Sequence, residues 1–143
     1  MRYWDASAVV PLIADEPGSD LVRAWAREDP DVVTWGLTRV EVASAIERLA
    51  REGGLNPSTR REALTELDRL AAAWHEVTDL LAVRARALPI LARHALRAAD
   101  AAQLGAALTV ADPDPASLIV VCLDRRLAEA AEREGFSLRS WPA

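Results

Sequence analysis

The sequence predicts an α/β fold, specifically a three-layer α/β/α sandwich around a mostly parallel central sheet. Two patterns support this prediction. Short apolar segments typical of strands alternate along the chain with longer segments in which apolar residues recur at helical spacing. The segment Leu118–Leu123 (LIVVCL) is apolar throughout, as expected of a strand buried on both faces of a parallel sheet. The 143 residues suit one domain, which we expect to span residues 1–143.

The first half of the chain contains two strand–helix units and a helical pair. Residues 2–5 form the first expected strand, which leads into the apolar run AVVPLI, a helix that Ser7 is well placed to cap. A Pro-Gly turn closes this unit. The further elements expected are a helix at 19–27, a strand at 32–34, a helix at 38–52 that ends at two glycines, and a helix at 58–74.

The second half adds the strongest strand and an edge strand. A brief strand is expected at 75–78, followed by two helices rich in alanine and leucine that are separated near His94. The proline-rich run DPDP is a loop that precedes the apolar strand. The expected helices lie at 80–93, 95–110 and 125–134, and the expected edge strand at 137–141.

The composition excludes several classes of protein. No apolar run approaches the roughly 20 residues of a membrane-spanning helix, and the chain starts without a signal-peptide pattern, so we expect a cytoplasmic protein that avoids membranes. Cys122 is the only cysteine, which rules out an internal disulfide, and two histidines without helical metal spacing disfavour a zinc hydrolase. The chain contains no lysine, which excludes a P-loop.

Four acidic residues stand out: Asp5, Glu41, Asp100 and Asp124. Asp5 and Asp124 directly follow predicted strands, and in parallel sheets ligands bind beyond the carboxyl ends of the strands. Asp100 interrupts an alanine-rich helical face, where aspartate is a poor helix former. The net charge of −5 argues against nucleic acid, but neutralising these four acids in one site would leave −5 + 4 = −1.

Each acid also has a purely structural interpretation. Thr38 and Glu41 fit a capping box, in which Glu41 returns a hydrogen bond to the start of its helix. Asp100 could cap a helix that starts directly after it, Asp124 could cap the last helix, and Asp5 could cap the first helix in place of Ser7. These roles do not exclude metal binding. Mg²⁺ takes oxygen ligands, and crowded carboxylates repel one another unless a cation offsets them.

Four segments that cover nearly the whole chain contain the four acids, and they read YWDASAVVPLIADEPGS, TRVEVASAIERL, LRAADAAQLGAAL and IVVCLDRRLAEAAEREGF. In this order they resemble the motifs of PIN-domain proteins, in which an aspartate closes the first strand and a Ser or Thr follows two positions later. Length and motif style are closest to the VapC group, the ribonuclease toxins of toxin–antitoxin pairs.

The resemblance implies an endoribonuclease that depends on Mg²⁺ or Mn²⁺. By analogy, Asp5 and Asp100 are the expected direct metal ligands, while Asp124 and Glu41 complete the shell through direct or water-mediated contacts and orient the attacking water. Ser7 and Thr38 are either helix caps or donors that steady neighbouring carboxylates. The arginines next to the motifs are candidates for contacting RNA phosphates, for which their planar fork is suited. They are Arg39, Arg93, Arg97 and Arg125.

Three residues near the motifs have ordinary structural expectations. Cys122 stands where the family commonly has Thr or Ser, and we expect it to be a small buried residue at a strand end. Trp4 is expected in the core, and His94 at a helix end. A phosphatase with Asp5 as nucleophile is excluded, because that mechanism needs a second aspartate at position 7 and a lysine.

The resemblance also implies partners and leaves one alternative open. It implies a cognate antitoxin that blocks the acidic cleft, binding of the pair to its own promoter, and a homodimer. A catalytically inactive PIN-like module that acts only by pairing with the antitoxin is the alternative function. The presence of all four acids favours retained catalysis.

Overall fold

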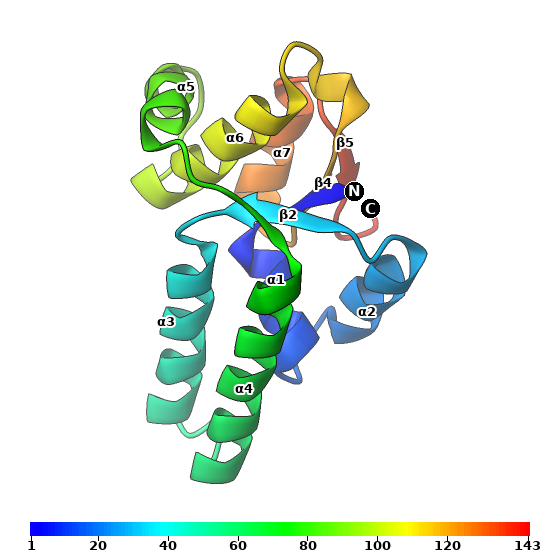
Figure 1. Cartoon of the computed structure of the whole chain (residues 1–143), viewed down its shortest axis with the longest axis vertical. Helices are drawn as coiled ribbons and strands as arrows, with labels where there is room; N and C mark the ends of the chain where they lie inside the picture. Colours follow the sequence, from blue (N-terminus) through cyan, green and yellow to red (C-terminus); the bar gives the residue numbers. More distant parts are fainter.

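The structure, a computed structural model that describes all 143 residues, is the predicted three-layer α/β/α sandwich (Figure 1). Its sheet has five strands in the order β3-β2-β1-β4-β5, and every neighbouring pair is parallel. The central strand β1 therefore has two strands on each side and lies furthest from the two edges of the sheet. The strands are β1 (Arg2–Trp4), β2 (Val32–Trp35), β3 (His75–Val77), β4 (Ile119–Val121) and β5 (Ser137–Arg139).

The helices cover the two faces of the sheet in two groups, each with its own buried cluster (Figure 1). The first four helices pack on one face, where α3 and α4 lie side by side, and the last three pack on the other. They are α1 (Ala6–Ile13), α2 (Ser19–Glu28), α3 (Thr38–Arg51), α4 (Pro57–Ala73), α5 (Leu80–Arg93), α6 (Ala98–Ala111) and α7 (Arg125–Arg133).

Alternation along the central strands supplies side chains to both layers. Tyr3 packs into the cluster under α5 to α7, and its neighbour Trp4 packs into the cluster under α1 to α4. Val120 and Val121 divide in the same way. Because successive side chains of a strand point to opposite faces, a strand covered on both sides must be apolar at every position. This explains the continuous apolar run of the fourth strand and confirms the core position expected for Trp4.

Many predicted element boundaries differ from the structure by one residue, and several differ by two or more. The apolar strand predicted at 118–123 spans only Ile119–Val121. The first helix begins at Ala6 rather than two residues later, because the Asp5 side chain caps it. The helix predicted from residue 95 begins at Ala98, because Arg97 has extended backbone dihedral angles. The edge strand ends at Arg139 rather than at 141. None of the helices is both long and apolar enough to cross a membrane.

The parallel arrangement brings the carboxyl ends of all strands to one edge of the sheet. Trp4 pairs with Val121, so the residues that follow β1 and β4 lie next to each other. Two residues separate the end of β2 from the start of α3, which lies beside the same edge. Asp5, Asp124 and Glu41 therefore reach one region from three separate parts of the chain.

Candidate active site

Asp5 follows the central strand and is almost fully buried, with 4% of its surface exposed. It caps α1, because its Oδ2 accepts a hydrogen bond from the backbone N–H of Ser7 at 3.2 Å. The Ser7 hydroxyl donates to Asp5 Oδ1 at 2.7 Å. Burial raises the pKa of the Asp5 carboxyl to about 6, against the lowering effect of the hydrogen bonds from Ser7. Asp5 is thus an anion held in an environment that disfavours its charge.

Ser7 joins the ends of two neighbouring strands. Its Oγ accepts hydrogen bonds from the backbone N–H groups of Leu123 at 2.9 Å and Asp124 at 3.0 Å, while donating to Asp5. One donor and two acceptor positions are all that a hydroxyl offers, so Ser7 is fully used. The prediction that Ser7 caps the first helix is wrong, because Asp5 takes that position. The predicted hydrogen bond from Ser7 to a neighbouring carboxylate is present.

Asp124 directly precedes the last helix and caps it, as predicted. Its Oδ1 accepts a hydrogen bond from the backbone N–H of Leu127 at 3.1 Å, which caps α7. Its charge raises the pKa of both Asp5 and Asp100. The cap therefore fixes the side chain near the other acids, and capping and a ligand role remain compatible.

Glu41 lies in the first turn of α3 but does not form the predicted capping box. The residue that precedes the helix is Leu37, which has no side-chain cap. Glu41 Oε1 instead accepts a hydrogen bond from Gln103 Nε2 at 3.2 Å. Burial raises the pKa of Glu41 to about 7; Gln103 opposes this shift, and Asp5 and Asp100 add to it. A carboxyl with this pKa exchanges its proton near neutral pH.

Gln103 is a site residue that the sequence analysis missed. It is buried in α6, accepts a hydrogen bond from the Tyr3 hydroxyl at 2.6 Å, and donates to Thr38 Oγ1 at 2.9 Å as well as to Glu41. Thr38 Oγ1 also lies 2.7 Å from Thr34 Oγ1. Thr38 is neither a cap nor a direct partner of a carboxylate, so both of its predicted roles are wrong. The sequence feature that could have identified Gln103 is a single amide side chain in an alanine-rich segment.

Asp100 lies in the first turn of α6 and is half-buried. It does not cap the helix, because the helix begins at Ala98 and Arg97 occupies the capping position. Burial raises the pKa of Asp100, Asp124 raises it further, and Arg97 opposes the shift. The prediction that Asp100 caps this helix is therefore wrong, and the helix has no side-chain cap.

The four acids lie within electrostatic range of one another at the carboxyl end of the sheet. Asp124 acts on Asp5 and Asp100, while Asp5 and Asp100 act on Glu41. As the side chains stand, no three acidic, histidine or cysteine side chains are close enough together to hold one metal ion. The donors nevertheless suit Mg²⁺ or Mn²⁺ in kind, because they are hard oxygens whose mutual repulsion a cation would offset.

Two of the four candidate arginines form ion pairs within the chain, and the other two do not. Arg39 forms an ion pair with Asp68, and Arg93 forms a bidentate pair with Glu134 at 2.6 and 3.0 Å. Glu134 follows the C-terminal end of α7, so Arg93 lies at the opposite end of that helix from Asp124. Arg97 and Arg125 form no ion pair within the chain. Of the four candidates, they are the two without an ion-pair partner.

Cys122 and His94 have the structural roles expected of them. Cys122 is fully buried at the end of β4, and its thiol donates to the backbone oxygen of Asp124 at 3.3 Å. Burial raises the pKa of the thiol, which therefore stays protonated. His94 ends α5 and pairs with Glu134 at 2.7 Å. Cys122 nevertheless lies beside the acids, because its Sγ is 3.7 Å from Ser7 Oγ and its thiol lowers the pKa of Asp5.

The fold is a parallel α/β sandwich in which acidic residues follow the central strands. Comparison with known families identifies the class of protein that has this arrangement. The PIN domain profile matches residues 2–133, and the chain belongs to this family. Ribonuclease VapC45 of Mycobacterium tuberculosis (strain CDC 1551 / Oshkosh) is similar to this chain. The two are 35% identical over 133 residues, which cover 93% of this chain and 90% of that protein.

Two solved structures share the fold. FitAcB from Neisseria gonorrhoeae superposes with a TM-score of 0.67 at 19% identity, covering 96% of both chains. PAE2754 from Pyrobaculum aerophilum superposes with a TM-score of 0.65 at 20% identity, covering 96% of this chain and 89% of that one. These similarities extend over almost the entire chain, so the sandwich has no large additional element.

Proposed function

We propose that the protein is an endoribonuclease that uses Mg²⁺ or Mn²⁺ and is the toxin of a toxin–antitoxin pair. The similarity to a relative named as a ribonuclease supports RNA as the substrate. The structural observation that carries the proposal is the Ser7 bridge, which holds the Asp5 carboxylate beside the start of α7. This arrangement places two acids from distant parts of the sequence at one edge of the sheet.

The acids have separate roles in this proposal. Asp5 and Asp100 are the direct ligands, and Asp124 and Glu41 complete the shell directly or through water. When bound, a divalent ion lowers the pKa of a coordinated water and stabilises charge on phosphate oxygens. Glu41, whose Oε1 is held by the hydrogen bond from Gln103, helps to orient the attacking water. Of the candidate arginines, Arg97 and Arg125 have no ion-pair partner and would contact the substrate phosphates.

The proposed partners follow from the same assignment. A cognate antitoxin would cover the acidic edge, and the pair would bind its own promoter in the cytoplasm, with no role for a membrane. We also propose a homodimer. The support is a group of exposed apolar residues on α5, which single-chain soluble proteins rarely leave together in water. They are Leu80, Leu81, Leu88 and Leu91.

Purified protein is expected to cleave single-stranded RNA internally when Mg²⁺ or Mn²⁺ is added, and to stop when EDTA removes the metal. The measurement is gel analysis of end-labelled RNA. Expression in cells should arrest growth, and co-expression of the neighbouring open reading frame should relieve the arrest. A protein that binds that neighbour but never cuts RNA would instead be the inactive binding module.

Gln103→Leu is expected to shift the acidic limb of the pH–rate profile to higher pH. Gln103 donates to Glu41 and so lowers its pKa, and without that donor Glu41 stays protonated to a higher pH. The matched control is Tyr3→Phe, which removes a hydrogen bond to Gln103 but leaves Glu41 its donor. Each variant should also lose about 1–3 kcal/mol of stability from unpaired buried groups. Equal shifts of the limb in both variants would contradict the orienting role.

A further inference from the structure

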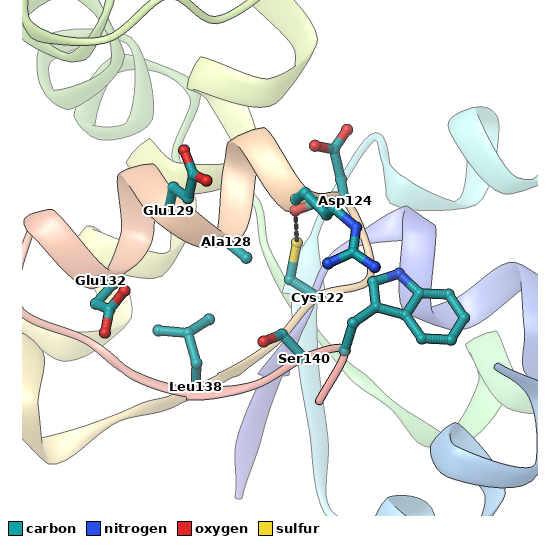
Figure 2. A pocket seen from close by; sticks show the side chains of 9 residues that line it. Cys122, Asp124, Ala128, Glu129, Glu132, Leu138 and Ser140 are labelled. Carbon is teal, nitrogen blue, oxygen red and sulfur yellow. Dashed lines mark hydrogen bonds between the residues drawn. The ribbon is translucent and has the colours of Figure 1, made fainter. Parts of the chain in front are cut away.

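A hollow of about 200 Å³ begins at Asp124 and extends between α7 and the C-terminal segment (Figure 2). Helix α7 contributes Ala128, Glu129 and Glu132, and Leu138 and Ser140 lie on the opposite wall. Along α7, Asp124 and Glu132 are roughly 12 Å apart at about 1.5 Å per residue. The hollow therefore connects one of the four acids with a second group of polar side chains.

We propose that this hollow receives an unpaired guanine base of the RNA, next to the phosphodiester that lies at Asp124. The inference rests on the proposed ribonuclease function and adds a base specificity to it. Proteins read single-stranded RNA by stacking splayed bases on aromatic side chains and by hydrogen bonding to their Watson–Crick edges. The hollow contains both kinds of group.

Trp141 is the aromatic wall of the hollow, and its position is fixed. Its indole N–H donates to the backbone oxygen of Leu123 at 2.8 Å, which ties the ring to the loop that leads to Asp124. The ring also lies against Gly18, where a Cβ would come within 2.8 Å of Trp141 Cη2. Trp141 is only half-buried and lines the hollow. A ring held before the ligand arrives gives up little conformational freedom when a base stacks on it.

Glu129 and Glu132 decide which base fits. Both are exposed, both line the hollow, and neither forms an ion pair or hydrogen bond within the chain. Their charge repels phosphate, so a nucleotide enters this end with its base. A carboxylate has two acceptor oxygens and no donor. Guanine is the base whose Watson–Crick edge presents two adjacent donors, N1–H and the N2 amino group, which match those oxygens.

Arg125 sets the orientation of the nucleotide. It lines the hollow at the Asp124 end and has no ion-pair partner in the chain. A guanidinium binds phosphate oxygens in pairs. Arg125 therefore supplies a positive charge at the end of the hollow next to Asp124, where the scissile phosphate would lie. Glu129 and Glu132 supply negative charge at the end where the base enters. This polarity favours one direction of the RNA strand.

The test maps cleavage in single-stranded RNAs that differ at one position, with the wild type, Glu129→Gln/Glu132→Gln and Trp141→Ala. The wild type should cut next to guanine about tenfold faster than next to the other bases. The double variant should lose most of this preference. Trp141→Ala should cut the guanine RNA more slowly, and Trp141→Phe, which keeps an aromatic ring, should recover the rate. Glu62→Gln, an exposed acid on α4, is the matched control and should keep the preference.

The outcomes separate this inference from the ribonuclease proposal. A wild type that cuts RNA without base preference, or a double variant that keeps the preference, overturns the guanine site and leaves the ribonuclease intact. If the wild type cuts no RNA, ligand-observed NMR with the four nucleoside monophosphates decides. Selective binding of guanosine monophosphate that the double variant loses supports the site, and equal or absent binding overturns it.

Discussion

Asp5→Asn is expected to abolish metal-dependent RNA cleavage, with a rate loss of about a thousandfold or more, because a bound metal supplies several kcal/mol of transition-state stabilisation. Asp100→Asn should have the same effect. The measurement is single-turnover cleavage of single-stranded RNA with Mn²⁺ under conditions in which the wild type cuts completely. Asp20→Asn is the matched control, because Asp20 is a fully exposed aspartate on α2 with only a 3.8 Å ion pair, and it should cut at the wild-type rate.

The same substitution should stabilise the metal-free protein. The pKa of Asp5 rises from its usual 3.8 to about 6 on folding, so the folded state holds the proton more tightly than the unfolded state does. The stability associated with this group is complete below pH 3.8 and is lost as the pH rises through 6. Asparagine has no charge, but its single acceptor oxygen keeps only one of the two hydrogen bonds that Asp5 accepts from Ser7. The lost bond offsets part of the gain, and at pH 8 we expect the variant to be more stable than the wild type by about 1 to 2 kcal/mol.

Chemical denaturation in EDTA at a series of pH values measures this gain. The difference between Asp5→Asn and the wild type should be small near pH 4 and should reach its plateau above the pKa of about 6. Adding Mn²⁺ should raise the wild-type stability and leave the variant nearly unchanged, because the variant lacks the ligand. A variant that still cuts RNA, or that gains as much stability from Mn²⁺ as the wild type does, would refute the ligand role.

The placement of Asp5 and Asp124 at one edge of the sheet could be predicted from strand order alone. Asp5 and Asp124 each follow an apolar strand, and a parallel sheet brings the carboxyl ends of its strands to one edge. Neither step needs knowledge of side-chain packing. The cap role of Asp124 was predicted and is present, whereas Asp5 was only the alternative to Ser7 as the cap of the first helix, and Asp5 forms that cap.

The wrong predictions concern side chains whose partners lie far away in the sequence. The spacing of Thr38 and Glu41 fits a capping box, but both side chains instead bind Gln103, more than sixty residues later. A local pattern cannot show that a buried amide competes for these groups. At Thr38 and Glu41, tertiary hydrogen bonds and not local propensity decided the outcome. The start of α6 was misplaced for a different reason, because the residue before the helix, Arg97, has no side-chain cap that a sequence pattern could reveal.

Ser7→Ala is expected to damage both folding and catalysis. It removes the donor to Asp5 and leaves the backbone N–H groups of Leu123 and Asp124 without an acceptor. Two unpaired, partly buried N–H groups should cost about 2 to 4 kcal/mol of unfolding free energy. Because the bridge also holds Asp5 beside the start of α7, cleavage should fall about a hundredfold even where the variant is fully folded. Chemical denaturation and single-turnover cleavage measure the two effects.

Two further variants separate positioning from general stability. Ser7→Thr keeps the hydroxyl and should restore most of both properties, whereas Ser44→Ala, an exposed serine on α3 without a hydrogen-bond partner, should change neither. The affinity for Mn²⁺, measured by calorimetry on folded protein, should fall with Ser7→Ala and return with Ser7→Thr. If Ser7→Ala lost stability but kept its Mn²⁺ affinity and cleavage rate, the bridge would serve the fold alone. Asp5 would then hold its position without help from the β4–α7 loop.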